Sequence, residues 1–120
     1  MNSIQDLKTR EDVPVIVANQ EGFIVSINAT FTAILGWNES DVIGEPLTKV
    51  LPDSFRDAHN LAFSRFQSTE RASVLNHPLQ LKTLTKDQGD ILTEHFIIAE
   101  KIENQWFFAA TLTPLPQERD

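Results

Sequence analysis

The chain has 120 residues, of which 41% are hydrophobic and 22% are charged, a balance typical of one globular domain. Its formal net charge of −7 would repel a phosphate backbone, so we expect no binding to nucleic acid. No apolar run reaches the roughly 18 residues of a membrane span, and residues 1–12 lack the apolar stretch of a signal peptide. We therefore expect a cytoplasmic segment that makes no membrane contact.

The chain begins with a leader, residues 1–12, and a hairpin. Ile4 and Leu7 have the spacing of an amphipathic helix, so the leader is expected to be a short helix or a frayed end. Two β-branched runs follow at residues 15–18 and 23–27, and turn-forming residues separate them. This pattern predicts a β-hairpin.

A block of helices is expected next. Asn28 can accept hydrogen bonds from the first turn of a helix, and Gly36 can end that helix. Shorter helices are expected at residues 39–42 and from Pro46 onward. The longest helix is expected at about residues 55–67.

The last part of the chain has the alternating pattern of strands. We expect strands at residues 79–84, 91–98 and 106–112, with a turn at residues 86–89 and a stop at Pro114. Strands that flank a block of helices indicate an α+β domain with an antiparallel sheet.

Three motifs, in this order, resemble the PAS family. Residues 22–31 resemble a strand that delivers Asn28 to the start of a helix. Residues 35–44 begin with Leu-Gly-Trp and end at a glycine, and residues 86–89 read Lys-Asp-Gln-Gly. Each motif alone is weak, but together they extend the resemblance over about residues 15–112.

The resemblance implies a five-stranded antiparallel sheet with helices packed across one face, in a domain of residues 13–114. Residues 115–120 would be a tail or a linker to an output domain such as a histidine kinase or a cyclase. The implied function is sensory signal transduction. We expect no enzymatic activity, because the sequence has no nucleophile motif and no glycine-rich phosphate loop.

The resemblance also places a small-molecule ligand between the sheet and the longest helix. The side chains expected to line that pocket are Ile27, Phe31, Leu35, His59, Phe63, Phe66, Leu81, Phe96, Ile98 and Phe108. One alternative is a structural dimerisation domain without a ligand, since eight Phe and two Trp side chains could fill the cavity.

A second alternative is a haem-based gas sensor. His59 and Arg65 resemble the long helix of haem-binding oxygen sensors, which implies His59 as the proximal ligand of haem b and Arg65 as a propionate partner. The sequence departs from those relatives at Leu79, which replaces a distal arginine, and at Ser73, which replaces a histidine. We expect His59 to be a pocket or packing residue rather than an iron ligand. The absence of cysteine excludes a covalent flavin adduct.

Two further expectations concern side chains on the sheet and in the leader. His95 is expected to point away from the core, because Phe96 beside it would point inward and successive strand residues face opposite sides. A homodimer is expected, because Ile4 and Leu7 of the leader and Trp106 of the last strand offer apolar surface to a second copy.

Overall fold

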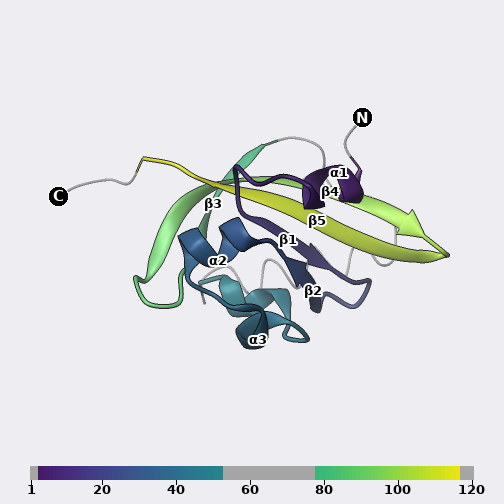
Figure 1. The fold of residues 1–120 in the computed structure, drawn as a ribbon, viewed down its shortest axis with the longest axis horizontal. Coiled ribbons are helices and arrows are strands. Elements are labelled where there is room, and N and C mark those ends of the chain that lie inside the picture. The colour runs from purple at the N-terminus through teal and green to yellow at the C-terminus, as the bar shows by residue number, and fades with distance from the viewer. Residues whose placement is uncertain (1–2, 53–77, 117–120) are drawn as a thin grey trace.

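Five strands form one antiparallel sheet in the order β2-β1-β5-β4-β3 (Figure 1). The computed structural model describes residues 3–52 and 78–116 of the chain. In chain order the elements are α1 (Ile4–Lys8), β1 (Val15–Ala18), β2 (Ile24–Ile27), α2 (Ala29–Leu35), α3 (Glu39–Val42), the 3₁₀ helix η1 (Leu47–Val50), β3 (Leu79–Leu84), β4 (Asp90–Ile102) and β5 (Gln105–Pro114). The predicted α+β class and the five-stranded antiparallel sheet are confirmed.

The predicted hairpin and the first helix form as their local signals indicate. The turn between β1 and β2 is closed by the amide of Asn19, which donates to the Phe23 carbonyl at 2.9 Å. Asn28 precedes α2 and accepts from the amide of Phe31 at 2.9 Å, so it is the predicted N-cap. Gly36 ends α2 with a left-handed φ of 86°, a conformation that glycine adopts without strain.

The other short helices also form, although one differs in type. α3 matches the prediction, whereas the segment after Pro46 is a single 3₁₀ turn, η1, rather than an α-helix. The expected helix at residues 55–67 lies outside the described residues. Within residues 3–52 and 78–116, no helix has both the length and the hydropathy that a membrane span requires.

The last two strands are longer than the sequence pattern predicts. β4 and β5 pair from Thr93 opposite Pro114 to Ile102 opposite Gln105, and the hairpin extends beyond the rest of the sheet (Figure 1). Glu103 and Asn104 make the turn with φ values of 50° and 68°, as a tight hairpin turn requires. Backbone pairing therefore continues through residues whose exposed, polar side chains interrupt the apolar pattern.

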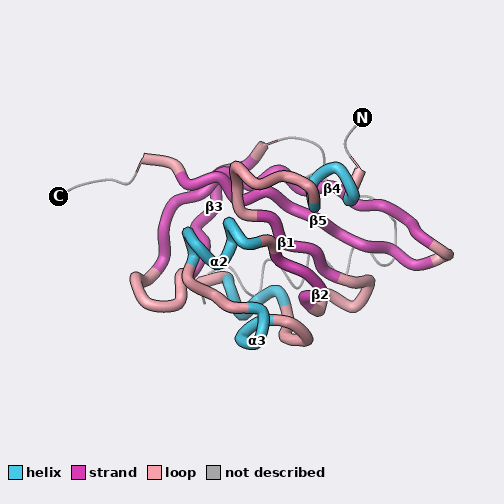
Figure 2. Tube along the Cα trace, viewed as in Figure 1, coloured by secondary structure: helices cyan, strands magenta, loops and turns pink. Residues whose placement is uncertain are grey.

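Each face of the sheet has its own apolar core, and the two faces carry different helices (Figure 2). On the inner face, α2, α3 and η1 pack over a buried cluster made of Ile16, Ile24, Ile27, Phe31, Leu35, Trp37, Val42, Val50 and Leu112. On the outer face, α1 contributes Ile4 and Leu7 to a second buried cluster. The other members of that cluster are Val13, Val15, Val17, Ile98 and Ala109. The helix block covers one face, as predicted, and the leader covers part of the other.

The helix block is attached to the β3–β4 hairpin by polar contacts. The indole of Trp37 donates to the Leu84 carbonyl at 2.8 Å, and the amide of Lys86 donates to the Leu35 carbonyl at 3.0 Å. The Lys86 ammonium lies 2.8 Å from the carboxylate of Asp41 in α3. These contacts hold the two ends of the inner face together.

Candidate functional site

A cluster of three buried polar side chains interrupts the apolar inner face of the sheet. Thr83 on β3 and Thr93 on β4 are both 0% exposed, and His95 on β4 is 5% exposed. Alternate residues of a strand share a face, and the register places Thr83 opposite Ile91, next to Thr93. We call these three residues the polar cluster.

The polar cluster is joined by short hydrogen bonds. The Thr83 and Thr93 hydroxyl oxygens lie 2.8 Å apart, and His95 Nε2 lies 3.0 Å from the first and 2.9 Å from the second. The Thr93 hydroxyl donates its only proton to the Leu81 carbonyl at 2.7 Å. Within the cluster Thr93 can therefore only accept, from the Thr83 hydroxyl or from an Nε2–H group.

The polar cluster is electrically neutral at neutral pH. Burial lowers the pKa of His95 from its usual 6.5 to about 4, because the imidazolium form would lose its hydration. Threonine hydroxyls carry no charge at any physiological pH. The inner face thus offers hydrogen-bonding groups without a formal charge.

Apolar side chains surround the polar cluster on the sheet. In the register, His95 lies between Leu79 and Leu112, and Thr93 lies opposite Leu81. Leu112 belongs to the buried cluster of the inner face. A molecule that occupied this part of the inner face would contact apolar side chains and, at one place, the polar cluster.

Most of the predicted pocket residues that the structure describes share the inner face. Ile27, Phe31 and Leu35 are buried in its core. Leu81 and Phe108 are half-buried on the same face, since Leu81 pairs with Thr93 and Phe108 with Ala18. Their lining of a ligand pocket remains a prediction.

The placement of Phe96, Ile98 and His95 was predicted wrongly. Phe96 and Ile98 pack with the outer cluster beneath α1, on the face opposite Phe31, and His95 points into the inner core. The alternation itself is correct, but its phase is reversed. Both faces of β4 carry apolar residues, so hydrophobicity could not tell which set points inward.

The polar cluster is the feature that sequence reasoning missed. Threonine is common in exposed strand positions, so Thr83 and Thr93 gave no signal by themselves. The alternation of Thr93 and His95 on one strand, two residues apart, was the available indication that they share a face.

The remaining predicted site residues, His59, Phe63, Arg65 and Phe66, lie outside the described residues. The haem ligand and the propionate partner therefore remain predictions. In the ranges 3–52 and 78–116, no three histidine, cysteine or acidic side chains gather in a way that could hold a metal ion.

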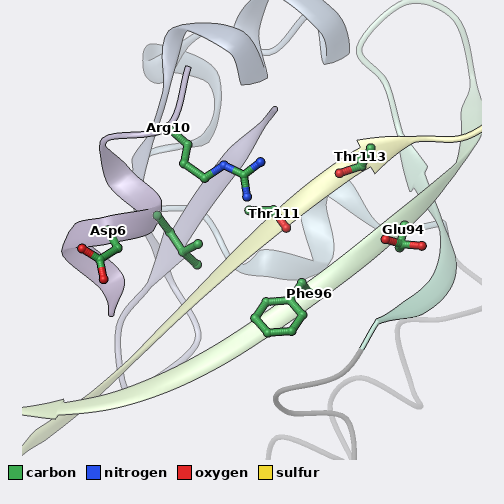
Figure 3. Close-up of a pocket in the computed structure, with 7 residues that line it drawn as sticks. Asp6, Arg10, Glu94, Phe96, Thr111 and Thr113 are labelled. Atoms are coloured by element: carbon green, nitrogen blue, oxygen red, sulfur yellow. The ribbon is translucent and has the colours of Figure 1, made fainter. Parts of the chain in front are cut away.

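The outer face has a shallow hollow beside α1 (Figure 3). It has a volume of about 390 Å³, and its lining residues are Asp6, Leu7, Arg10, Glu94, Phe96, Thr111 and Thr113. The Arg10 guanidinium is bound by both carboxylate oxygens of Asp12, at 3.0 and 2.7 Å. Because this cation already has its counter-ion and Asp6 and Glu94 also line the hollow, the hollow is a poor candidate for an anionic ligand.

Solved structures with this fold include PAS domains from several organisms. The PAS domain of a Desulfitobacterium hafniense protein has a TM-score of 0.71 and 16% identity, and the match covers 92% of this chain and 99% of that one. The PAS domain of an HTR-like protein from Haloarcula marismortui has a TM-score of 0.70 and 20% identity, with coverage of 93% and 88%. The PAS domain of the quorum-sensing receptor RpfR of Cronobacter turicensis, in complex with C12:0, has a TM-score of 0.68 and 15% identity, with coverage of 90% and 98%.

Sequence comparison gives the same family. An uncharacterized protein of Azorhizobium caulinodans is 32% identical over 87 residues, which are 72% of this chain and 12% of that protein. The chain thus spans only a small part of the length of that relative. A model of the PAS fold matches residues 3–93. The chain therefore belongs to the PAS fold family, as its motifs predicted.

Proposed function

We propose that this chain is a cytoplasmic, non-catalytic sensory module that binds a small molecule on the inner face of its sheet and relays occupancy to an output domain. PAS domains are typically sensory signal-transduction modules. The receptor domain from Cronobacter turicensis with this fold is solved in complex with C12:0, so the fold can accommodate a small molecule. We propose an output domain such as a histidine kinase or a cyclase.

The polar cluster is the observation that carries the proposal. A buried histidine with two threonines costs desolvation that an apolar core of the same shape would avoid. If the inner face had only a structural role, valine and leucine at these positions would make the folded state more stable. Hydrogen-bonding groups in an otherwise apolar environment are what a small-molecule site uses to orient its ligand.

The position of the polar cluster also suits a relay. Leu112 of β5 lies directly opposite His95, and β5 ends two residues later at Pro114. A ligand that changed the packing of His95 would therefore act on the strand that leads out of the domain. This short path supports the sheet as the element that transmits the state of the site.

A thermal-shift screen of the purified protein against a library of small molecules tests the proposal. A ligand that binds only the folded state raises the melting temperature in a concentration-dependent way. We expect such ligands among apolar compounds with one polar group. If no compound raises the melting temperature of the folded protein, the alternative of a structural dimerisation domain is favoured.

A visible absorption spectrum separates the haem alternative from the others. We expect no stoichiometric haem in the purified protein and no Soret band after haem is supplied. A Soret band that disappears in His59→Ala would show that His59 is an iron ligand and would replace this proposal with a gas sensor.

A further inference from the structure

We propose that the ligand is an uncharged, largely apolar molecule that donates a hydrogen bond, from a hydroxyl or an N–H group, to the polar cluster. This inference rests on the proposed function and names the chemical class of its ligand. It follows from the number of protons and lone pairs in the cluster and from the side chains around it.

The polar cluster has more acceptors than donors. With His95 Nε2 protonated, the cluster has about four lone pairs and about three protons, and with Nε2 unprotonated it has about five lone pairs and about two protons. Thr93 donates its proton to the Leu81 carbonyl, outside the cluster. The Thr83 hydroxyl and, in the first tautomer, the Nε2–H group are the remaining donors, so the acceptors outnumber the donors in either tautomer.

A ligand with a hydrogen-bond donor can use one of these unpaired acceptors. A hydroxyl or N–H group can donate to the oxygen of Thr83 or Thr93 while the bonds within the cluster persist. A ligand with only acceptor atoms competes for the protons that already make the bonds among Nε2 and the two hydroxyls. The hydrogen-bond inventory therefore favours donors over ethers, ketones and carboxylates.

The surroundings disfavour an anion independently. The cross-strand neighbours of the cluster are Leu79, Leu81, Ile91, Leu112 and Pro114, none of them charged. An anion buried against these side chains loses its hydration, and none of them carries a charge that could compensate for the loss. A carboxylate and a neutral molecule of the same length should therefore bind with different affinities.

Four probes of matched length test the inference at neutral pH by calorimetry and thermal shift. Octanol and octanamide are neutral donors, methyl heptyl ether is a neutral acceptor, and octanoate is an anion. We expect the two donors to bind at least about tenfold more tightly than the ether or the anion, which corresponds to about one hydrogen bond. Equal or tighter binding of octanoate or of the ether would overturn the inference.

Thr83→Val tests whether the polar cluster is the acceptor. Valine has the shape of threonine without its oxygen, so the donors should lose about tenfold in affinity and the ether should lose none. Thr111→Val is the matched control, because Thr111 is also a buried strand threonine, 5% exposed, but lies beside the hollow on the outer face. Thr111→Val should leave all four affinities unchanged. Unfolding curves of both variants establish that they are folded.

The two proposals can fail separately. If none of the four probes binds but another compound of the wider screen does, the ligand class is wrong and the sensory function stands. If Thr83→Val binds the donors as tightly as the wild type, Thr83 of the polar cluster does not accept a hydrogen bond from the ligand. If no compound in the screen binds the folded protein, the proposed function itself fails.

Discussion

At the scale of single residues, His95 makes folding depend on pH. Its pKa is about 4 in the folded protein and about 6.5 in the unfolded chain, so the unfolded chain binds a proton first as the pH falls. The folded state, which holds His95 in its neutral form, keeps its full stability above about pH 6.5 and loses it progressively as the pH falls to about 4. At about pH 5 this residue should lower the free energy of unfolding by about 2 kcal/mol relative to about pH 7.5.

Urea unfolding of the wild type and of His95→Gln at both pH values measures this effect. Glutamine can occupy the place of Nε2 and hydrogen-bond to threonine, but it does not titrate. The variant should therefore lose less stability than the wild type between the two pH values. Carboxylates elsewhere contribute equally to both proteins and cancel in the comparison. Identical pH dependence would show that His95 does not bind its proton as its burial predicts.

Phe31 is a second residue whose role can be measured alone. It belongs to α2, and its side chain is 0% exposed in the inner core. Phe31→Ala should lower the free energy of unfolding by about 3–5 kcal/mol, because it removes buried apolar area and leaves a cavity. Ile34 on the same helix is 42% exposed, so Ile34→Ala should change it by less than about 0.5 kcal/mol. A loss below about 1 kcal/mol for Phe31→Ala would mean that the ring is not buried.

At the scale of elements, α1 depends on the sheet for its existence. A helix of five residues is too short to be stable alone. It is held by the burial of Ile4 and Leu7, by the capping box of Ser3 and Asp6, and by the amide of Ile4, which donates to the Glu100 carboxylate at 2.9 Å. The helix therefore belongs to the outer core of the domain.

Replacing Ile4 and Leu7 together by alanine should lower the free energy of unfolding by about 2 kcal/mol or more. The expected cause is loss of the contacts with Val17 and Ile98 on the outer face. Gln5→Ala, at an exposed position of the same helix, is the control and should have little effect. If the double variant unfolds like the wild type, α1 does not stabilise the domain.

At the scale of the whole molecule, the expected homodimer cannot use the leader residues Ile4 and Leu7 for its contact. Ile4 and Leu7 contact their own sheet and are not available to a second copy. The hollow on the outer face beside α1 is lined by Arg10, Glu94 and Phe96, among other residues (Figure 3). We expect the contact of a two-fold dimer to be centred on Phe96.

Light scattering after gel filtration tests this dimer. We expect the wild type to have the mass of a dimer, and Phe96→Asp to shift the mass towards the monomer because a charge would enter the centre of the contact. Ile34→Asp places the same charge at an exposed apolar position on the other face and should leave the mass unchanged. An unchanged dimer for Phe96→Asp would exclude this surface.

In residues 3–52 and 78–116, the sequence by itself determined most of the elements and their order. Asn28 as a helix cap, Gly36 as a helix stop and the glycine of the turn at residues 86–89 act through bonds to near neighbours, so their effect can be read without knowing the fold. The motifs that resemble the PAS family contain these same residues. The lengths of β4 and β5 could not be read in this way, because backbone pairing holds them where the side-chain pattern fades.

Only the tertiary structure decided which side chains meet. Phe96 and His95 are neighbours on β4, and a pattern of alternation is equally consistent with either one inside. The docking of α1 on one face and of α2 on the other selected the phase, and it brought His95 to Thr83 and Thr93 across two strands. The candidate site arises from strand register and face, which are non-local properties that a single sequence does not specify.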